Sequence, residues 1–287
     1  TQDLFAQASW QVAAPLRLIG GLRLSLLPDA YRRTRWEPSE PLPVREVAPV
    51  EDTTVLNGQL ALLWSPRPDQ LLKLAWGTAS QDADQIELPE AERIETLEAN
   101  YTLTRPRWMA SAALFQNRLS QLVRTIQRID PLTGLYLSED DNSGRWRTLG
   151  LELITEAQPL PALHLSASLT WQQTEDTEAE IDPGYSPALL AKLKADWRQG
   201  PLTYAAYAHY VDGMDADWDF VAGPEQGVVG RIGESVPGYW DLGVNLRWAP
   251  RDTGPYATFH VSNLLDTEIR HPANELTDFA RGLIGPG

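Results

Sequence analysis

Three alternating aspartates lie in the stretch VDGMDADWDF, and their spacing is one that could bind a cation. Asp215, Asp217 and Asp219 follow the order of the first oxygen ligands of an EF-hand calcium loop. Phe220 occupies the position where that loop needs glycine, and Gln226 the position where it needs a bidentate glutamate. The motif is therefore incomplete, and two interpretations of the stretch remain: a loop that binds a cation loosely, or a solvated acidic loop. We assign no metal ligand.

His260 and Ser262 could serve in nucleophilic catalysis, because alternate residues of a strand share one face. Such chemistry needs the histidine as a base for the serine and a third group that orients the histidine. No oxyanion or calcium feature accompanies the pair. The alternative, which we favour, is that both side chains only line a polar strand face. The chain then has no catalytic residue and needs no cofactor.

The composition excludes several classes of protein. The 287 residues carry a formal net charge of −15 and a pI of about 4.7, so no nucleic-acid partner is expected. The absence of cysteine removes disulfides, zinc–thiolate sites and thiol catalysis. No run of 18 apolar residues occurs, so no transmembrane helix is expected. A membrane-spanning β-strand needs only about ten residues, half of them polar, and remains compatible with the mean hydropathy of −0.33.

Alternation of apolar and polar residues dominates the chain, most clearly in 238–263. There Trp240, Leu242, Val244, Leu246 and Trp248 share one face, with polar residues and glycine between them. This period of two predicts a strand whose two sides meet different solvents. The same pattern predicts about twelve strands, over 4–12, 16–26, 55–65, 71–78, 94–103, 107–124, 147–156, 163–172, 189–197, 202–210, 240–248 and 257–261. In 188–197 a short helix is the alternative.

The connections alternate in length along the whole chain. Short turns such as 66–69 and 199–201 alternate with long loops such as 28–53, 80–92, 128–145, 174–186, 212–237 and 264–287. Short turns on one side and long loops on the other are typical of an outer-membrane barrel. Tryptophan supports this interpretation, because it clusters at strand ends and would form two interfacial belts. Five lie beside short turns and four toward long loops: Trp10, Trp64, Trp108, Trp197 and Trp248, then Trp76, Trp146, Trp171 and Trp240.

Several segments together resemble the C-terminal barrel of TonB-dependent outer-membrane receptors. They are LPEAERIETLEANYTL, WMASAALFQNRLSQLV, GRWRTLGLELITEAQP, LHLSASLTWQQT and VSNLLDTEIRHP. The last is similar to the family's Val-x-Asn-Leu-x-Asp segment. The resemblance covers essentially the whole chain, and the order of the segments carries more weight than any one of them. It implies an antiparallel up-and-down transmembrane β-barrel in the Gram-negative outer membrane, surrounded by lipid.

The chain departs from this family in three ways. The family places a plug domain and a TonB-binding segment before the barrel, and 1–287 contains neither. The family's barrel has about 22 strands, against the twelve or so predicted here. The chain stops at Gly285, Pro286 and Gly287, where a last strand ending in an aromatic residue is expected. The resemblance therefore implies a fragment, 1–287 being a partial barrel that reaches the plug and TonB only through a missing N-terminal region.

The first functional hypothesis is a segment of a receptor for TonB-dependent uptake of a scarce small molecule, such as a metal chelate of the siderophore type. The candidate contacts at the extracellular mouth are Arg145, Trp146, Asp215, Asp217, Trp218 and Asp219, chosen by loop position. A self-contained twelve-stranded outer-membrane hydrolase is a second hypothesis, because outer-membrane phospholipases use histidine, serine and asparagine on such a barrel. A passive porin-like channel is a third.

Overall fold

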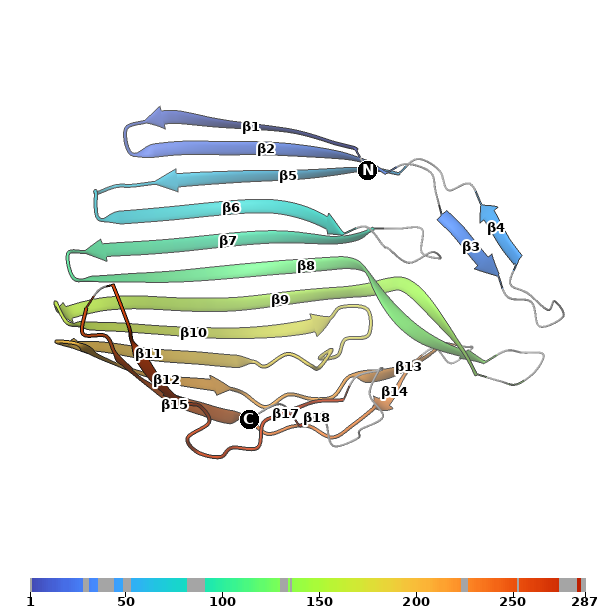
Figure 1. Ribbon diagram of the computed structural model, residues 1–287. Helices are drawn as coiled ribbons and strands as arrows, with labels where there is room; N and C mark the ends of the chain where they lie inside the picture. The colour runs from blue at the N-terminus through green and yellow to red at the C-terminus, as the bar shows by residue number, and fades with distance from the viewer. Residues whose placement is uncertain are drawn as a thin grey trace.

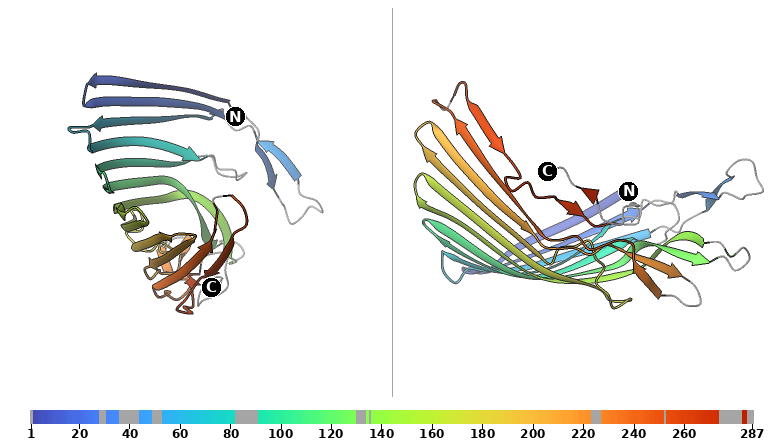
Figure 2. Two further views of the ribbon diagram at one scale, coloured as in Figure 1. Left: turned by 60° about the vertical axis from the view of Figure 1, so that its left-hand side comes forward. Right: turned by 90° about the horizontal axis from the view of Figure 1, so that it is seen from below.

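The computed structural model shows an all-β protein. It describes residues 2–27, 31–35, 44–48, 53–81, 91–129, 134, 136–222, 227–251, 253–273 and 283–284. No helix in this described part is long and apolar enough to cross a membrane. The main feature is one large antiparallel sheet that curves like a section of a barrel wall (Figures 1 and 2).

Twelve strands of this sheet form an uninterrupted meander in which each pairs with the next, as the sequence predicts. They are β1 (Gln2–Ala13), β2 (Leu16–Leu27), β5 (Thr53–Trp64), β6 (Gln70–Gln81), β7 (Glu92–Arg105), β8 (Trp108–Ile129), β9 (Tyr136–Leu160), β10 (Leu163–Asp176), β11 (Leu189–Gln199), β12 (Leu202–Val211), β15 (Tyr239–Trp248) and β16 (Ala257–Val261). The prediction of strand over 188–197 is confirmed, since Leu189–Gln199 is β11. Within the described residues β1 pairs only with β2, and β16 only with β15, so the sheet is open.

Three hairpins and one long ribbon lie where the sequence predicted loops. β8 and β9 are 22 and 25 residues long and pair as far as Ile129 and Tyr136, so a loop over 128–145 was wrong for most of its length. This strand pairing could not be predicted from the sequence, because the acidic run in 139–141 breaks the alternation that marks a strand. The other hairpins are β3 (Tyr31–Arg35) with β4 (Val44–Ala48), β13 (Trp218–Ala222) with β14 (Gly227–Arg231), and β17 (Arg270–His271) with β18 (Leu283–Ile284).

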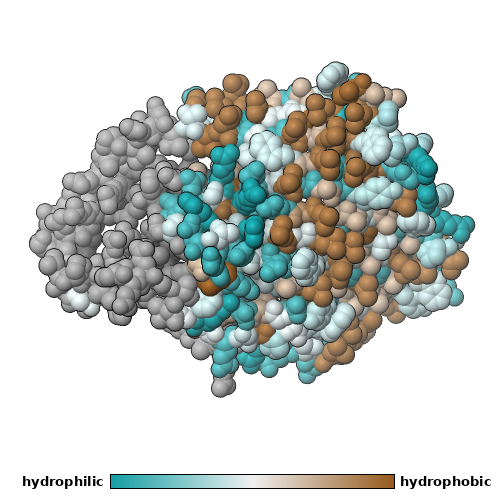
Figure 3. Space-filling view, turned by 180° about the vertical axis from the view of Figure 1, so that it is seen from behind, coloured by the Kyte–Doolittle hydropathy of each residue, from teal (hydrophilic) through white to brown (hydrophobic). Residues whose placement is uncertain are grey.

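The two faces of the meander differ in polarity. The register aligns apolar side chains from strand to strand on one face, as in the row Leu62, Leu74, Ala99, Leu114 and Leu151. Leu114 is 62% exposed there, which a water-soluble sheet would avoid. We call this the outer face. Figure 3 shows it from behind as a broad hydrophobic surface.

The opposite, inner face carries a network of polar contacts. Asn100 Nδ2 donates to Ser111 Oγ at 3.0 Å, and Thr96 Oγ1 donates to Asn117 Oδ1 at 2.9 Å. Lys73 forms an ion pair with a glutamate of β7 at 2.8 Å. These groups satisfy one another across neighbouring strands, as a wet or occupied barrel interior requires.

The tryptophan belts are confirmed with one exception. Trp10, Trp64, Trp108, Trp197 and Trp248 lie on the outer face beside the short turns, each more than 40% exposed. Trp76, Trp171 and Trp240 lie on the same face toward the long loops. Trp146 belongs to the inner face instead, because it sits in register with Leu119 and Asp176. It follows Arg145 directly, and strand alternation turns the two side chains apart.

Candidate ligand-binding loops

The compact part of the protein lies at the long-loop end rather than in the sheet. Fully or nearly buried residues gather there, among them Asp176, Met214, Ala216, Val236, Pro272 and Ala273. They come from 176–186, 212–218, 230–238 and 271–273, which we call the loop cluster. Backbone bonds tie its parts together, with Tyr185 N donating to Asp215 O at 2.8 Å and Asp217 N to Ala273 O at 3.1 Å. The loops are therefore packed against one another and present a preorganised surface.

Arg231 connects three parts of the loop cluster. Its Nη1 donates to Ala216 O at 2.6 Å, and its Nη2 to Asp182 O at 3.2 Å. Nη2 also lies 3.4 Å from Asp215 Oδ2. The guanidinium carbon stands 4.3 Å from the centre of the Trp218 ring, a cation–π distance. The planar, multi-donor guanidinium suits this role, because it satisfies two loop carbonyls and an aromatic face together.

The segment 182–185 is shaped to receive Arg231 and Trp218. Trp218 Nε1 donates to Asp182 O at 2.6 Å, the same carbonyl that accepts from Arg231. Asp182 Oδ1 accepts the backbone N–H of Gly184 at 2.7 Å, which forms a tight local turn. Gly184 is buried with φ of +78°, and a Cβ there would lie 2.5 Å from Arg231 Nη1 and 2.6 Å from Ala216 O. Only glycine fits this close approach without a shift.

The predicted aspartates separate into different roles. Asp215 accepts a short hydrogen bond from Ser235 Oγ and faces Arg231. Asp217 is half-buried, and its Oδ1 accepts the backbone N–H of Trp218 at 3.0 Å. Burial raises the pKa of Asp217, an effect that the Trp218 N–H and the charge of Arg231 partly offset. Asp219 pairs with Gly230 through its backbone in β13, and its side chain lies outside the described residues.

No cation site forms from these residues as described. Among the side chains that the structure places, no three or more histidine, aspartate or glutamate groups converge as metal ligands would. His260, the other candidate for chemistry, lies on the inner face of β16 with its ring stacked 6.5 Å from Tyr207. Within the described contacts, no hydrogen bond joins His260 to Ser262, which follows the end of β16.

Arg145 and Trp146 stand apart from the Asp215–Trp218 group. Arg145 is exposed and forms an ion pair with Glu178 at 2.8 Å. Its carbonyl accepts the backbone N–H of Thr177 at 2.8 Å, so it anchors the start of the loop after β10. This loop connects to Trp218 at Asp182. The candidate residues thus form one packed group and one separate strand segment.

Sequence reasoning missed Arg231 and Gly184. The available signal was Asp-Pro-Gly at 182–184, a strong turn motif that lies inside the long loop predicted over 174–186. Arg231 offers no comparable motif, because its partners are backbone carbonyls distant in sequence.

A curved antiparallel wall with an aromatic-bounded apolar outer face, a polar inner face and loops packed at one end defines an outer-membrane β-barrel. The family described as TonB dependent receptor-like, beta-barrel, matches residues 1–264. The chain belongs to this family of outer-membrane receptors, whose members are transporters and not enzymes, which sets the hydrolase hypothesis aside. No curated protein matches the chain significantly in sequence.

Solved receptors share the fold at low sequence identity. The copper transporter OprC is 19% identical with a TM-score of 0.77, and the match covers 99% of this chain and 46% of the OprC chain. The ferric-catecholate import receptor Fiu from E. coli K12 is 17% identical with a TM-score of 0.71, and the match covers 98% of this chain and 42% of the Fiu chain. The ferripyoverdine receptor of the Pseudomonas aeruginosa outer membrane is 17% identical with a TM-score of 0.65, covering 93% and 34%. The chain thus spans less than half the length of each.

Proposed function

We propose that this chain supplies wall strands and ligand-contacting loops to an outer-membrane receptor that takes up a scarce small molecule, such as a metal chelate, with energy delivered through TonB and a plug domain. The observation that carries the proposal is the loop cluster, a preorganised polar and aromatic surface at the long-loop end of a membrane wall. Preorganisation favours tight binding because little ordering entropy remains to be lost. A general diffusion channel has no need of such a surface.

The chemistry of the cluster suits an anionic or aromatic chelate. Arg231 and Trp218 present a cation and an indole side by side, and Tyr185 beside them is 43% exposed with φ of +54°. A non-glycine residue held in the left-handed region is a strained conformation that often marks a functional position. Three structural relatives support a metal-linked cargo, because they are a ferric-catecholate import receptor, a copper transporter and a receptor bound to ferripyoverdine.

Uptake by the receptor, expressed from its complete gene in cells that lack their own chelate receptors, tests the proposal. Cells would be given ⁵⁵Fe-loaded catecholate and hydroxamate chelates, and radioactive copper, with and without TonB. Trp218→Ala is the informative variant, and Trp171→Ala, in the outer-face belt, is the matched control. We expect TonB-dependent accumulation of at least one compound, reduced at least about tenfold by Trp218→Ala, since an aromatic anchor contributes more than about 1.4 kcal/mol.

Two results would contradict the proposal. Accumulation that is equal with and without TonB would indicate a passive channel. TonB-dependent accumulation that Trp218→Ala and Trp171→Ala leave equally unchanged would remove the loop cluster from ligand binding.

A further inference from the structure

Two lysines lie side by side on the inner face of β11. Lys192 and Lys194 are two residues apart, so their side chains leave the same face of the strand, about 7 Å from each other along it. Lys192 is directly opposite Ser168 of β10 and His209 of β12. We call Lys192, Lys194, Ser168 and His209 the lysine site. Directly opposed residues have Cβ atoms about 5 Å apart, so these side chains can reach one small anion together.

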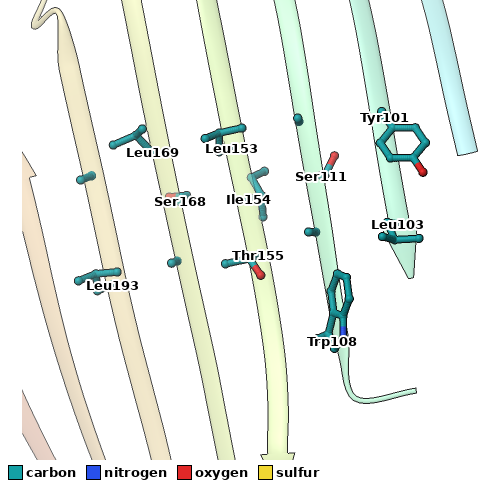
Figure 4. Close-up of a pocket in the computed structure, with 14 residues that line it drawn as sticks. Tyr101, Leu103, Trp108, Ser111, Leu153, Ile154, Thr155, Ser168, Leu169 and Leu193 are labelled. Atoms are coloured by element: carbon teal, nitrogen blue, oxygen red, sulfur yellow. The ribbon is translucent and has the colours of Figure 1, made fainter. Parts of the chain in front are cut away.

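The outer face of the same strands is apolar. Leu153, Leu169 and Leu193 line a hollow of about 550 Å³ there (Figure 4). Leu193 lies between the two lysines in sequence, and successive side chains of a strand point to opposite faces. The lysines therefore project away from the lipid and into the barrel interior.

The carboxylates nearest to the lysine site do not pair with Lys192. Asp196 forms an ion pair with Lys194 at 3.0 Å. Asp241 of β15, opposite His209, and the inner-face glutamates of β9 are each two strands away from β11, which is about 10 Å. Within the contacts of the described residues, Lys192 is exposed and has no ion pair or hydrogen bond. Its ammonium group is therefore available to an external anion.

The lysine site lies in the wall below the loop cluster. Of the cluster's segments, 176–186 connects β10 to β11, and 212–218 and 230–238 belong to the connection from β12 to β15. Lys192 is five residues from Trp197 of the short-turn belt, about 17 Å along the strand and about 12 Å along the membrane normal. This depth is close to the middle of the bilayer. An anion that leaves the loop cluster along the inner wall would meet the site about halfway.

We propose that the lysine site binds the anionic oxygens of the cargo midway along its passage through the barrel, and so favours negatively charged chelates over neutral ones. The inference rests on the proposed uptake function. Two ammonium groups on one face repel each other, and an oxyanion between them removes that repulsion. Ionisable groups at membrane depth that face a polar interior mark substrate pathways, and lysine or arginine on a pore wall selects anions.

The chemistry of the site suits an anion with several oxygens. Ammonium groups donate to carboxylate, catecholate or phosphate oxygens, and Ser168 and His209 each supply a further donor. The net charge of −15 makes the chain as a whole repel such an anion, so the site provides a local attraction. A carboxylate of the plug domain would fit the same charges, and the experiments separate it from the cargo.

Acetylation of the purified receptor, expressed from its complete gene, tests anion binding without transport. Mass spectrometry would measure the acetylation rates of Lys192 and Lys194 with and without inorganic pyrophosphate at constant ionic strength. Lys73, which pairs with Glu98 on the inner face at 2.8 Å, is the internal control. We expect pyrophosphate at saturation to slow acetylation of the two site lysines at least about fivefold and that of Lys73 less than about twofold. Equal protection of all three lysines would overturn the proposal.

Uptake measurements test the role of the site in cargo passage. Cells that express the complete receptor would be given an anionic ⁵⁵Fe tris-catecholate and a neutral ⁵⁵Fe trihydroxamate. Lys192→Gln should lower the uptake rate of the anion at least about tenfold, because a charge-assisted hydrogen bond is worth that much. Binding of the anion at the cell surface and uptake of the neutral chelate should stay unchanged. Lys192→Arg should keep most of the anion uptake, and Lys73→Gln is the matched control.

Four uptake results would overturn the proposal. The first is unchanged anion uptake in Lys192→Gln, and the second is an equal loss for both chelates. The third is a native receptor that prefers the neutral chelate. The fourth is faster entry of a large antibiotic such as vancomycin into Lys192→Gln cells, which would show that Lys192 holds the plug. Absence of TonB-dependent uptake in the native receptor would instead refute the proposed function, and the acetylation rates would still decide whether the site binds an anion.

Discussion

Gly184→Ala should loosen the loop cluster much more than a glycine substitution elsewhere. The φ of +78° alone makes any side chain unfavourable by about 1–2 kcal/mol. The new Cβ would also stand 2.5 Å from Arg231 Nη1 and 2.6 Å from Ala216 O, two atoms that form a hydrogen bond with each other. Losing a hydrogen bond to a charged group costs about 1.5–3 kcal/mol. The combined penalty is therefore about 2.5–5 kcal/mol.

Hydrogen–deuterium exchange of the membrane-embedded receptor measures this penalty directly. Since about 1.4 kcal/mol corresponds to a factor of ten, peptides covering 176–186 and 212–218 should exchange roughly 100-fold faster or more. Gly200→Ala is the matched control, because Gly200 has φ of +58° but no atom within 4 Å of its added Cβ. It should accelerate exchange only about tenfold, at its own turn.

Equal acceleration in the two variants would refute the reasoning. It would mean that the positive φ alone accounts for the faster exchange, and that Arg231 can move without losing its hydrogen bond to Ala216 O. An unchanged exchange rate in Gly184→Ala would be stronger evidence against the reasoning, since it would contradict the observed packing of 182–185 against Arg231.

Other substitutions test the role of Arg231 in the loop cluster, the raised pKa of Asp217 and the exposure of the outer face to lipid. Arg231→Lys should raise proteolytic cleavage within the loop cluster several-fold, because an ammonium cannot bridge two carbonyls and stack on an indole, whereas Arg251→Lys should not. Asp217→Asn should slow loop exchange at neutral pH. The raised pKa of Asp217 means that its contribution to stability is present below the ordinary aspartate pKa of about 3.9 and lost as pH rises through the raised value, so the two proteins should converge near pH 3. Leu114→Arg should destabilise the wall in liposomes by about 2–4 kcal/mol by urea titration, and inner-face Ser166→Arg should be tolerated.

The wall could be predicted from the sequence because a bilayer imposes a simple rule on every strand. Leu242, Val244 and Leu246 meet lipid while Asp241 and Asn245 meet the interior, so each strand carries its own alternating signal. Strands beyond the lipid lose that constraint. In the first part of β9 the sequence places Asp140 next to Asp141, which breaks the alternation, although the backbone there still pairs with β8.

The loop cluster could be predicted only in part, for a different physical reason. Trp218 and Asp215 were found because their side-chain chemistry is visible in the sequence. Trp218 donates to the backbone oxygen of Asp182, and Arg231, which faces Asp215, donates to that of Ala216; every residue type has such an oxygen. Contacts of this kind depend on how distant loops pack, and no local pattern encodes them.

Strand geometry also divides the candidate ligand contacts into two groups. Arg145 and Trp146 are neighbours in sequence, but successive side chains of a strand point to opposite faces. Arg145 shares its side of β9 with Arg147, and Trp146 faces inward opposite buried Asp176. A small ligand between the loops could contact Trp146 or Arg145, but not both. We therefore expect a ligand that approaches β9 from the barrel interior to meet Trp146, while Arg145 stays on the opposite side with its partner Glu178.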